Sequence, residues 1–150
     1  MTDLTTEIRF FQVSGRFPQR NILRQCLSET AAGFGLQKIR LHFVFLSDEE
    51  LLVYNKQFLQ HDYYTDILTF NISDPETDVL EGEIYISKDR VTENARTFKS
   101  SRETEYCRVI VHGLLHLCGM DDHEEDDRKK MEAAENAFIK RYFEIQKQAG

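Results

Sequence analysis

The chain of 150 residues lacks the features of a membrane, exported or repeat protein. No apolar run approaches the roughly 18 residues that span a bilayer. The first residues, MTDLTTEIRFFQ, contain no basic segment followed by an apolar one, so we expect no signal peptide. No segment recurs at a repeat-protein period. With 41% hydrophobic residues, the chain can bury a core, and we expect a single domain over residues 1–150.

Cysteine is also scarce, and acidic residues outnumber basic ones. Cys26, Cys107 and Cys118 are odd in number and have no CxxC spacing, which favours reduced thiols in a cytoplasmic protein. The net charge of −7 argues against a general nucleic-acid binder, and we expect no DNA binding. The charge is uneven, however, because residues 16–40 carry five basic side chains against Glu29 alone. The chain can therefore have a local basic face although its net charge is negative.

The apolar periodicity predicts an α+β domain with a mixed sheet of about four strands and about five helices. The expected strands are 7–13, 38–47, 66–73 and 82–87, and the expected helices are 18–32, one from Ser47, one from Ser87, 102–118 and 126–147. Ser47 and Glu50 have the spacing of a capping box. Gly119 is placed to end the helix over 102–118, which we expect to be central.

Two histidines on this central helix predict a metal site. His112 and His116 are four residues apart, so they differ by about 40° in azimuth and about 6 Å in rise, and their rings can chelate one divalent ion. A stop at Gly119 would fold residues 120–123 back toward the pair and supply a third ligand. Three protein ligands and an open position are typical of catalytic zinc. The carboxylates from Glu124 to Asp127 are better explained as the first turn of the next helix.

Gly113 stands where the HExxH motif of zinc proteases carries the glutamate that acts as general base. Peptide hydrolysis is therefore a weak interpretation. An ordinary structural reason for glycine here is close packing of a strand against the helix.

Three segments resemble the YbeY-type endoribonucleases, also called rRNA maturation factors. HGLLHLCGMDDH resembles the H-G-x-L-H-L-x-G-x-D-H signature of that family. DYYTDILTFNI (62–72) resembles its T-[DN]-V-L-[ST]-F segment, and LEGEIYIS (80–87) resembles its L-G-D-I-x-I-S strand. The matches fall in the family's order, and the length and expected architecture fit throughout.

The resemblance implies a zincin-like fold and a hydrolase that holds one Zn²⁺ ion. It implies cleavage of single-stranded RNA, with roles in maturing the rRNA of the small ribosomal subunit and in ribosome quality control. The expected partners are this rRNA, the ribosome or its small subunit, and the proteins associated with it. In the expected reaction, water activated by the metal attacks a phosphodiester.

The sequence departs from the family at the third metal ligand. The family has histidine six places after the second ligand, and here that place is Asp122, with His123 one residue further. A carboxylate can bind zinc in place of imidazole. We therefore predict His112, His116 and Asp122 as ligands, with His123 as the alternative third ligand.

A second departure concerns phosphate binding and the general base. Members commonly carry an arginine before the T-[DN]-V-L segment, where this chain has Leu59. Candidate cations, on charge alone, are Lys56, Arg102 and Arg108. Asp121 and Glu105 are weak candidates for the base, and Asp66 or Asp121 could orient a ligand imidazole.

Two further expectations concern RNA binding. Basic residues on the 18–32 helix and around 88–108 would lead RNA to the metal. Tyr63 and Tyr64 could stack bases, but core packing or a plain surface turn explains these two better. Because an arginine and a motif glutamate are both missing, one alternative stays open. It is a metal-stabilised ribosome assembly factor that binds ribosomal components and cleaves nothing.

Overall fold

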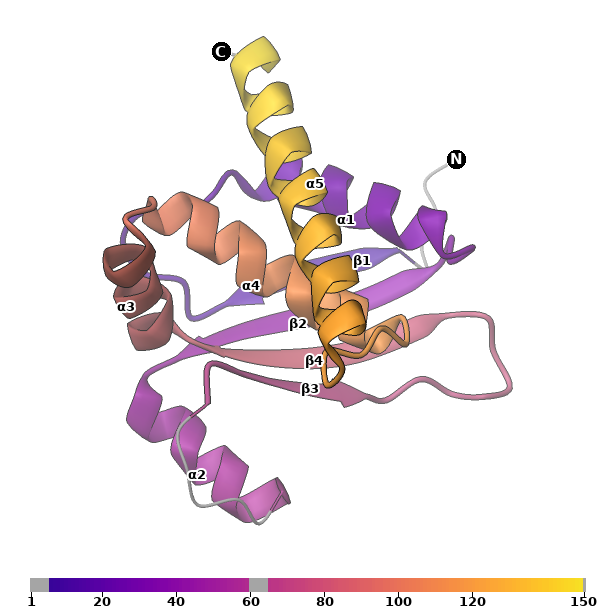
Figure 1. The fold of residues 1–150 in the computed structure, drawn as a ribbon. Helices are drawn as coiled ribbons and strands as arrows, with labels where there is room; N and C mark the ends of the chain where they lie inside the picture. Colours follow the sequence, from indigo (N-terminus) through magenta and orange to yellow (C-terminus); the bar gives the residue numbers. More distant parts are fainter. Residues whose placement is uncertain (1–5, 60–64, 150) are drawn as a thin grey trace.

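The structure is a computed structural model that describes residues 6–59 and 65–149. Within these ranges, four strands and five helices follow in the order expected from the sequence (Figure 1). The strands are β1 (Glu7–Phe11), β2 (Ile39–Leu46), β3 (Ile67–Asn71) and β4 (Leu80–Ser87). The helices are α1 (Arg20–Gly33), α2 (Asp48–Leu59), α3 (Lys88–Phe98), α4 (Arg102–Leu117) and α5 (Glu125–Ala149).

The strands form one mixed sheet, as the sequence predicted, and their order in it is β1-β2-β4-β3. The β1–β2 and β2–β4 pairs are parallel, whereas β3 runs antiparallel to β4 at the edge. β4 begins at Leu80, two residues before the predicted start, because Leu80 pairs with Ile39 and its N–H donates to the Lys38 carbonyl at 2.9 Å.

The two faces of the sheet are covered unequally. α1, α4 and α5 lie on one side, and α2 lies on the other (Figure 1). Alternate residues of β2, including Leu41 and Phe43, are fully buried under the first group of helices and form the main core with Ile84 and Ile110. A smaller core around Leu46, Leu51 and Leu68 lies beneath α2.

α4 is the central helix of the main layer. It packs against α1, α3 and α5 and against strands β3 and β4. Its buried residues recur at helical spacing, and Ile110 and Leu114 are completely enclosed. A helix held on several sides can fix the positions of the side chains that it carries.

Local sequence signals explain where the elements begin and end. The capping box is confirmed, since the Glu50 N–H donates to Ser47 Oγ at 3.1 Å and the Ser47 N–H donates to Glu50 Oε1 at 3.0 Å. Gly119 has φ of +96° just beyond α4, a conformation that favours glycine. α1 begins at Arg20 rather than at 18, because Gln19 is extended and serves as the N-cap.

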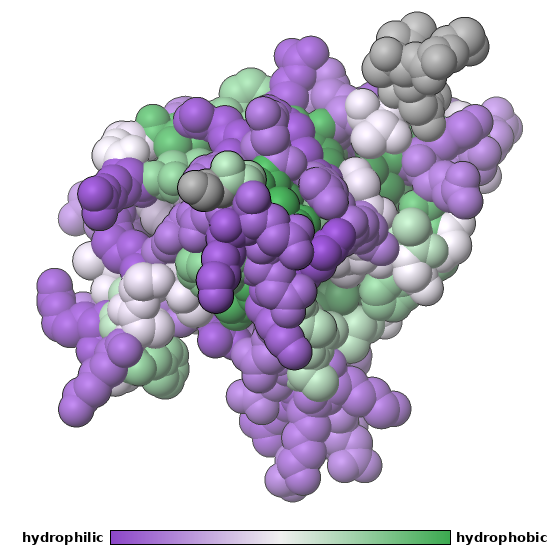
Figure 2. Space-filling model, turned by 90° about the horizontal axis from the view of Figure 1, so that it is seen from above, coloured by the Kyte–Doolittle hydropathy of each residue, from purple (hydrophilic) through white to green (hydrophobic). Residues whose placement is uncertain are grey.

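None of the helices in the described ranges is both long enough and apolar enough to cross a membrane. The face turned to the viewer in Figure 2 is mostly hydrophilic, with apolar side chains visible in smaller areas between polar ones. The 25-residue α5 likewise has a buried apolar stripe, formed by Met131, Phe138 and Tyr142, and a polar side.

Candidate metal centre

The C-terminal half of α4 brings the two helical histidines together. The rings of His112 and His116 meet edge to face with centroids 4.5 Å apart. Their Nε2 atoms are 2.9 Å apart. The i, i+4 spacing therefore has the consequence predicted from it, because both rings project from one side of the helix.

The turn after α4 adds a carboxylate to this pair. Gly119 reverses the chain, and the Met120 N–H donates to the Leu115 carbonyl at 3.0 Å. Asp122 Oδ2 then lies 3.6 Å from His112 Nε2 and 3.5 Å from His116 Nε2. One ligand atom from each of these three residues lies within 4.8 Å of the other two.

The outer nitrogens of both rings contact acceptors. His112 Nδ1 is 2.6 Å from Glu135 Oε2, and His116 Nδ1 is 3.1 Å from the Met120 carbonyl oxygen. A carbonyl can only accept, and a carboxylate normally does, so each Nδ1 carries the proton when the ring is neutral. Each Nε2 then presents a lone pair, and the two lone pairs face each other beside a carboxylate. This donor set fits a divalent cation.

Electrostatics around His112 favour a positive charge. Burial alone would lower the pKa of His112, but the hydrogen bond to Glu135 and the charges of Glu135, Asp66 and Asp122 outweigh it. The pKa of His112 is therefore raised above its ordinary value. The same carboxylates would favour a cation held between the rings.

His123 and Asp121 lie apart from this convergence. The His123 side chain is 84% exposed, and its Nε2 contacts Asp121 Oδ1 at 3.3 Å. Asp121 Oδ1 also accepts from the backbone N–H groups of Asp122 and His123, at 2.7 and 3.3 Å. Asp121 thus stabilises the turn that presents Asp122. The structure gives it no contact with the ring nitrogens of His112 or His116.

Glu135 is the site residue that the sequence reasoning missed. It lies on α5, 23 positions after His112, and is almost completely buried. It takes the orienting position that Asp66 or Asp121 was expected to fill. A signal was available, because Glu135 falls on the apolar stripe of α5 between Met131 and Phe138, where a carboxylate needs a partner.

Arg108 belongs to the same buried network. Its Nη1 is 3.5 Å from Glu135 Oε1, and its Nε is 3.4 Å from Glu105 Oε1. Glu105 also accepts from Ser100 Oγ at 2.7 Å. Arg108 therefore compensates two buried carboxylates, which leaves it poorly placed to bind phosphate. Glu105, held in this way, is equally poorly placed to act as a base.

A cavity of about 200 Å³ opens beside this network. Asp66, Asn94, Arg108, His112 and Glu135 are among the residues that line it. It gives the His112 ring access to a hollow with several hydrogen-bonding groups, as expected for the neighbourhood of a reactive site.

The glycine within the histidine motif has the packing role expected for it. A Cβ atom at Gly113 would lie 2.8 Å from Ile84 Cγ2 and 3.1 Å from Ile67 Cδ1. Close approach of α4 to β3 and β4 therefore requires glycine at this position.

Among the basic residues expected to guide RNA, Arg90, Arg96 and Arg108 are engaged in ion pairs. The pairs are Arg90–Asp48, Arg96–Glu93, Arg108–Glu105 and Arg108–Glu135. Arg16 and Arg102 have no ion pair among the residues that the structure describes. Tyr63 and Tyr64 lie outside the described residues.

The chain is similar to known proteins of one family over most of its length. The family model described as "Endoribonuclease YbeY" matches residues 7–143. A protein of that name from Phocaeicola vulgatus is 46% identical over 113 residues, which cover 75% of this chain and 80% of the relative. A relative of the same name from Porphyromonas gingivalis is 39% identical over 135 residues, covering 89% and 88% of the two chains.

A solved structure agrees with the fold. The solution structure of a Thermotoga maritima protein superposes with a TM-score of 0.64 at 27% identity. The superposition covers 95% of this chain and 93% of the other. The likeness therefore extends over the sheet and its helices as a whole.

Proposed function

Because the chain belongs to the endoribonuclease YbeY family and is therefore a hydrolase of the nuclease class, we propose that it is a zinc-dependent endoribonuclease specific for single-stranded RNA. The observation that carries the metal dependence is the convergence of His112 Nε2, His116 Nε2 and Asp122 Oδ2. Family membership favours this function over a non-catalytic assembly factor.

His112, His116 and Asp122 would hold the metal. Zinc bound there would supply a Lewis acid and lower the pKa of water toward about 7. Three protein ligands leave a position for water or substrate, as in other catalytic zinc sites. Asp122 is preferred to His123 because its Oδ2 faces both ring nitrogens.

The remaining residues of the site support these ligands. Glu135 fixes the ring of His112 with Nδ1 protonated, so that Nε2 is the ligand atom. Arg108 holds Glu135 in place from the side of α4, and Asp121 holds the turn that carries Asp122. None of these groups is placed as a general base. The attacking water would then lose its proton to the substrate phosphate or to solvent.

We also propose where the enzyme acts and on which RNA. We place the enzyme in the cytoplasm, acting on rRNA of the small ribosomal subunit during maturation and in ribosome quality control, in contact with the subunit and its proteins. The fold is interpreted as zincin-like, since two histidines of a central helix lie against a mixed sheet.

The proposal is tested by comparing the parent protein with His116→Ala and with His42→Ala. Bound metal is measured by elemental analysis, and cleavage is followed with a labelled single-stranded RNA. We expect His116→Ala to lose both metal and cleavage. His42 bonds to Glu7 on the sheet and should be dispensable for both. Cleavage that persists in His116→Ala after full loss of metal would remove zinc from the mechanism.

A further inference from the structure

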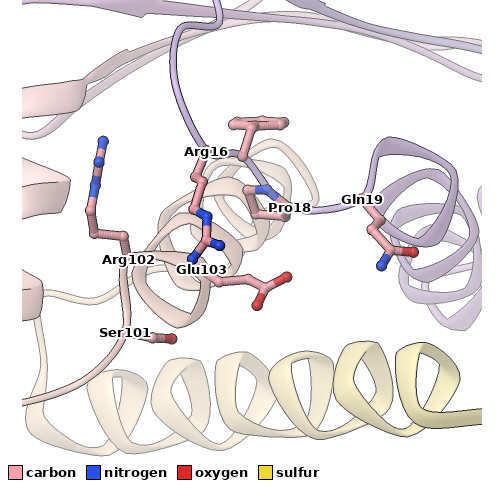
Figure 3. A pocket seen from close by; sticks show the side chains of 7 residues that line it. Arg16, Pro18, Gln19, Ser101, Arg102 and Glu103 are labelled. Atoms are coloured by element: carbon pink, nitrogen blue, oxygen red, sulfur yellow. The ribbon is translucent and has the colours of Figure 1, made fainter. Parts of the chain in front are cut away.

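A cavity larger than the one beside the metal ligands lies away from those ligands, at the beginning of α4. It has a volume of about 470 Å³. Figure 3 shows Arg16, Gln19, Ser101, Arg102 and Glu103 around it, contributed by the segment before α1 and by the start of α4. Residues remote in sequence thus form a second hollow.

The two arginines of this cavity keep their charge available. Neither Arg16 nor Arg102 makes an ion pair with a described residue, and both are exposed. The Arg102 guanidinium lies 5.9 Å from the centroid of the Tyr106 ring, which supports one face of the group. The edges of the guanidinium that carry the N–H donors remain open to a ligand.

One carboxylate lines the cavity, and it is committed elsewhere. Glu103 Oε2 accepts from the Tyr142 hydroxyl at 2.6 Å and from Gln146 Nε2 at 2.8 Å. These bonds hold Glu103 toward α5, and it makes no ion pair with either arginine. The lining therefore carries two positive charges and one negative charge, in a chain whose net charge is −7.

We propose that this cavity binds a phosphate group of the RNA strand and so serves as a backbone anchor remote from the metal centre. Guanidinium groups bind phosphate through paired N–H donors, and Arg16 and Arg102 would contribute two such groups. The side-chain amide of Gln19 can donate one further bond. The inference rests on the proposed function, because it takes RNA as the substrate.

The position of the anchor sets its relation to the cleavage site. Arg102 precedes His112 by ten residues of one helix, so the anchor lies about 15 Å from the metal centre along α4. An RNA strand that is bound at both places must therefore extend beyond the nucleotides that flank the scissile bond. The anchor would add affinity for long strands and leave the chemistry at the metal unchanged.

The test measures binding of a labelled single-stranded RNA by fluorescence anisotropy over a range of salt concentrations. A chelator is present, so that the strand is not cleaved. We expect the double variant Arg16→Ala/Arg102→Ala to bind about tenfold more weakly, and the slope of log K against log salt to fall in magnitude by about 0.7, for the one phosphate contact that is lost. Arg16→Lys/Arg102→Lys keeps the charge and should retain most of the slope.

Matched variants separate a specific anchor from general charge. Arg9→Ala/Arg141→Ala removes the same charge from two exposed arginines that are paired with Glu7 and Glu29, and it should leave affinity nearly unchanged. Glu103→Gln should strengthen RNA binding, because it removes the negative charge from the lining. Circular dichroism checks that each variant is folded.

Equal affinity and equal salt slope for the Arg16/Arg102 and Arg9/Arg141 double variants would overturn the proposal. It is also overturned if the Arg16/Arg102 variant loses affinity for a polyglutamate peptide but not for RNA, since the cavity would then bind an acidic protein. Failure of the metal-dependent function appears separately. It would show as absent cleavage by the metal-loaded parent, whatever the binding data show.

Discussion

Gly113 of α4 faces Ile84 of β4 so closely that a single added methyl group would lie 2.8 Å from the Ile84 Cγ2 atom. The contact joins the helix that carries both histidines to a central strand of the sheet. The absence of glutamate from the histidine motif thus has a packing explanation. A longer side chain at 113 could not occupy this space without separating the helix from the sheet.

Gly113→Ala should destabilise the fold. Alanine favours a helix interior by about 1 kcal/mol over glycine, but overpacking at Ile84 and Ile67 costs about 1–3 kcal/mol. We expect a net loss of about 1 kcal/mol in urea unfolding. The matched change Gly33→Ala, at the end of α1, meets no atom within 4 Å and should be neutral or stabilising. Equal effects of the two changes would contradict the packing argument.

Glu135→Ala should weaken metal binding without removing a ligand. The loss of the bond to His112 Nδ1 frees the ring to rotate, and changes of this kind typically cost about 10–100-fold in affinity. Glu135→Gln keeps an acceptor and should lose less. Zinc affinity measured by competition with a chromophoric chelator tests both variants. Glu132→Ala, on the exposed side of the same helix, is the control and should bind zinc as the parent does.

The third ligand can be identified by comparing Asp122→Ala with His123→Ala. We expect Asp122→Ala to lose most of its zinc and His123→Ala to retain it, because Asp122 Oδ2 faces both rings whereas His123 is exposed. The readout is zinc bound per chain after dialysis. Loss of zinc in His123→Ala alone would require the turn after Gly119 to repack and would reverse the assignment.

Cys26 should resist alkylation in the folded protein. Burial raises the pKa of this thiol to about 11. The charge of Glu29 adds a smaller increase, which exceeds the decrease caused by Arg141. At pH 8 about one part in a thousand of the Cys26 side chains is therefore thiolate, whereas about a quarter of an ordinary thiol is ionised at this pH. Iodoacetamide labelling followed by mass spectrometry should show slow modification, which guanidinium accelerates. Rapid labelling of the native protein at pH 8 would show that the core around Cys26 is open.

The architecture was largely predictable, because it is encoded in local patterns. Alternating residues in 38–47 and helical spacing in 102–118 identify β2 and α4 without tertiary information. The His112–His116 pair and the glycine stop are local in the same way, and the structure brings Asp122 to them. Their role as ligands stays a prediction.

The features of the site that the sequence did not predict depend on contacts between segments that are far apart in the chain. The bond from Glu135 to His112 joins α5 to α4, and no short motif specifies it. The pairing of Arg108 with two buried carboxylates is also tertiary, which is why charge alone made Arg108 a phosphate candidate. A charged residue on an apolar stripe, such as Glu135, is the pattern that would have predicted this network.

The dependence of His112 on Glu135 also has a consequence for the order of synthesis. A ribosome makes the chain from its N-terminus, so the histidines are polymerised 19 and more residues before the carboxylate that orients the first of them. The contact between His112 and Glu135 therefore cannot form before residue 135 has been added. A chain shortened before Glu135 would keep both histidine rings and lose the carboxylate that fixes the first of them.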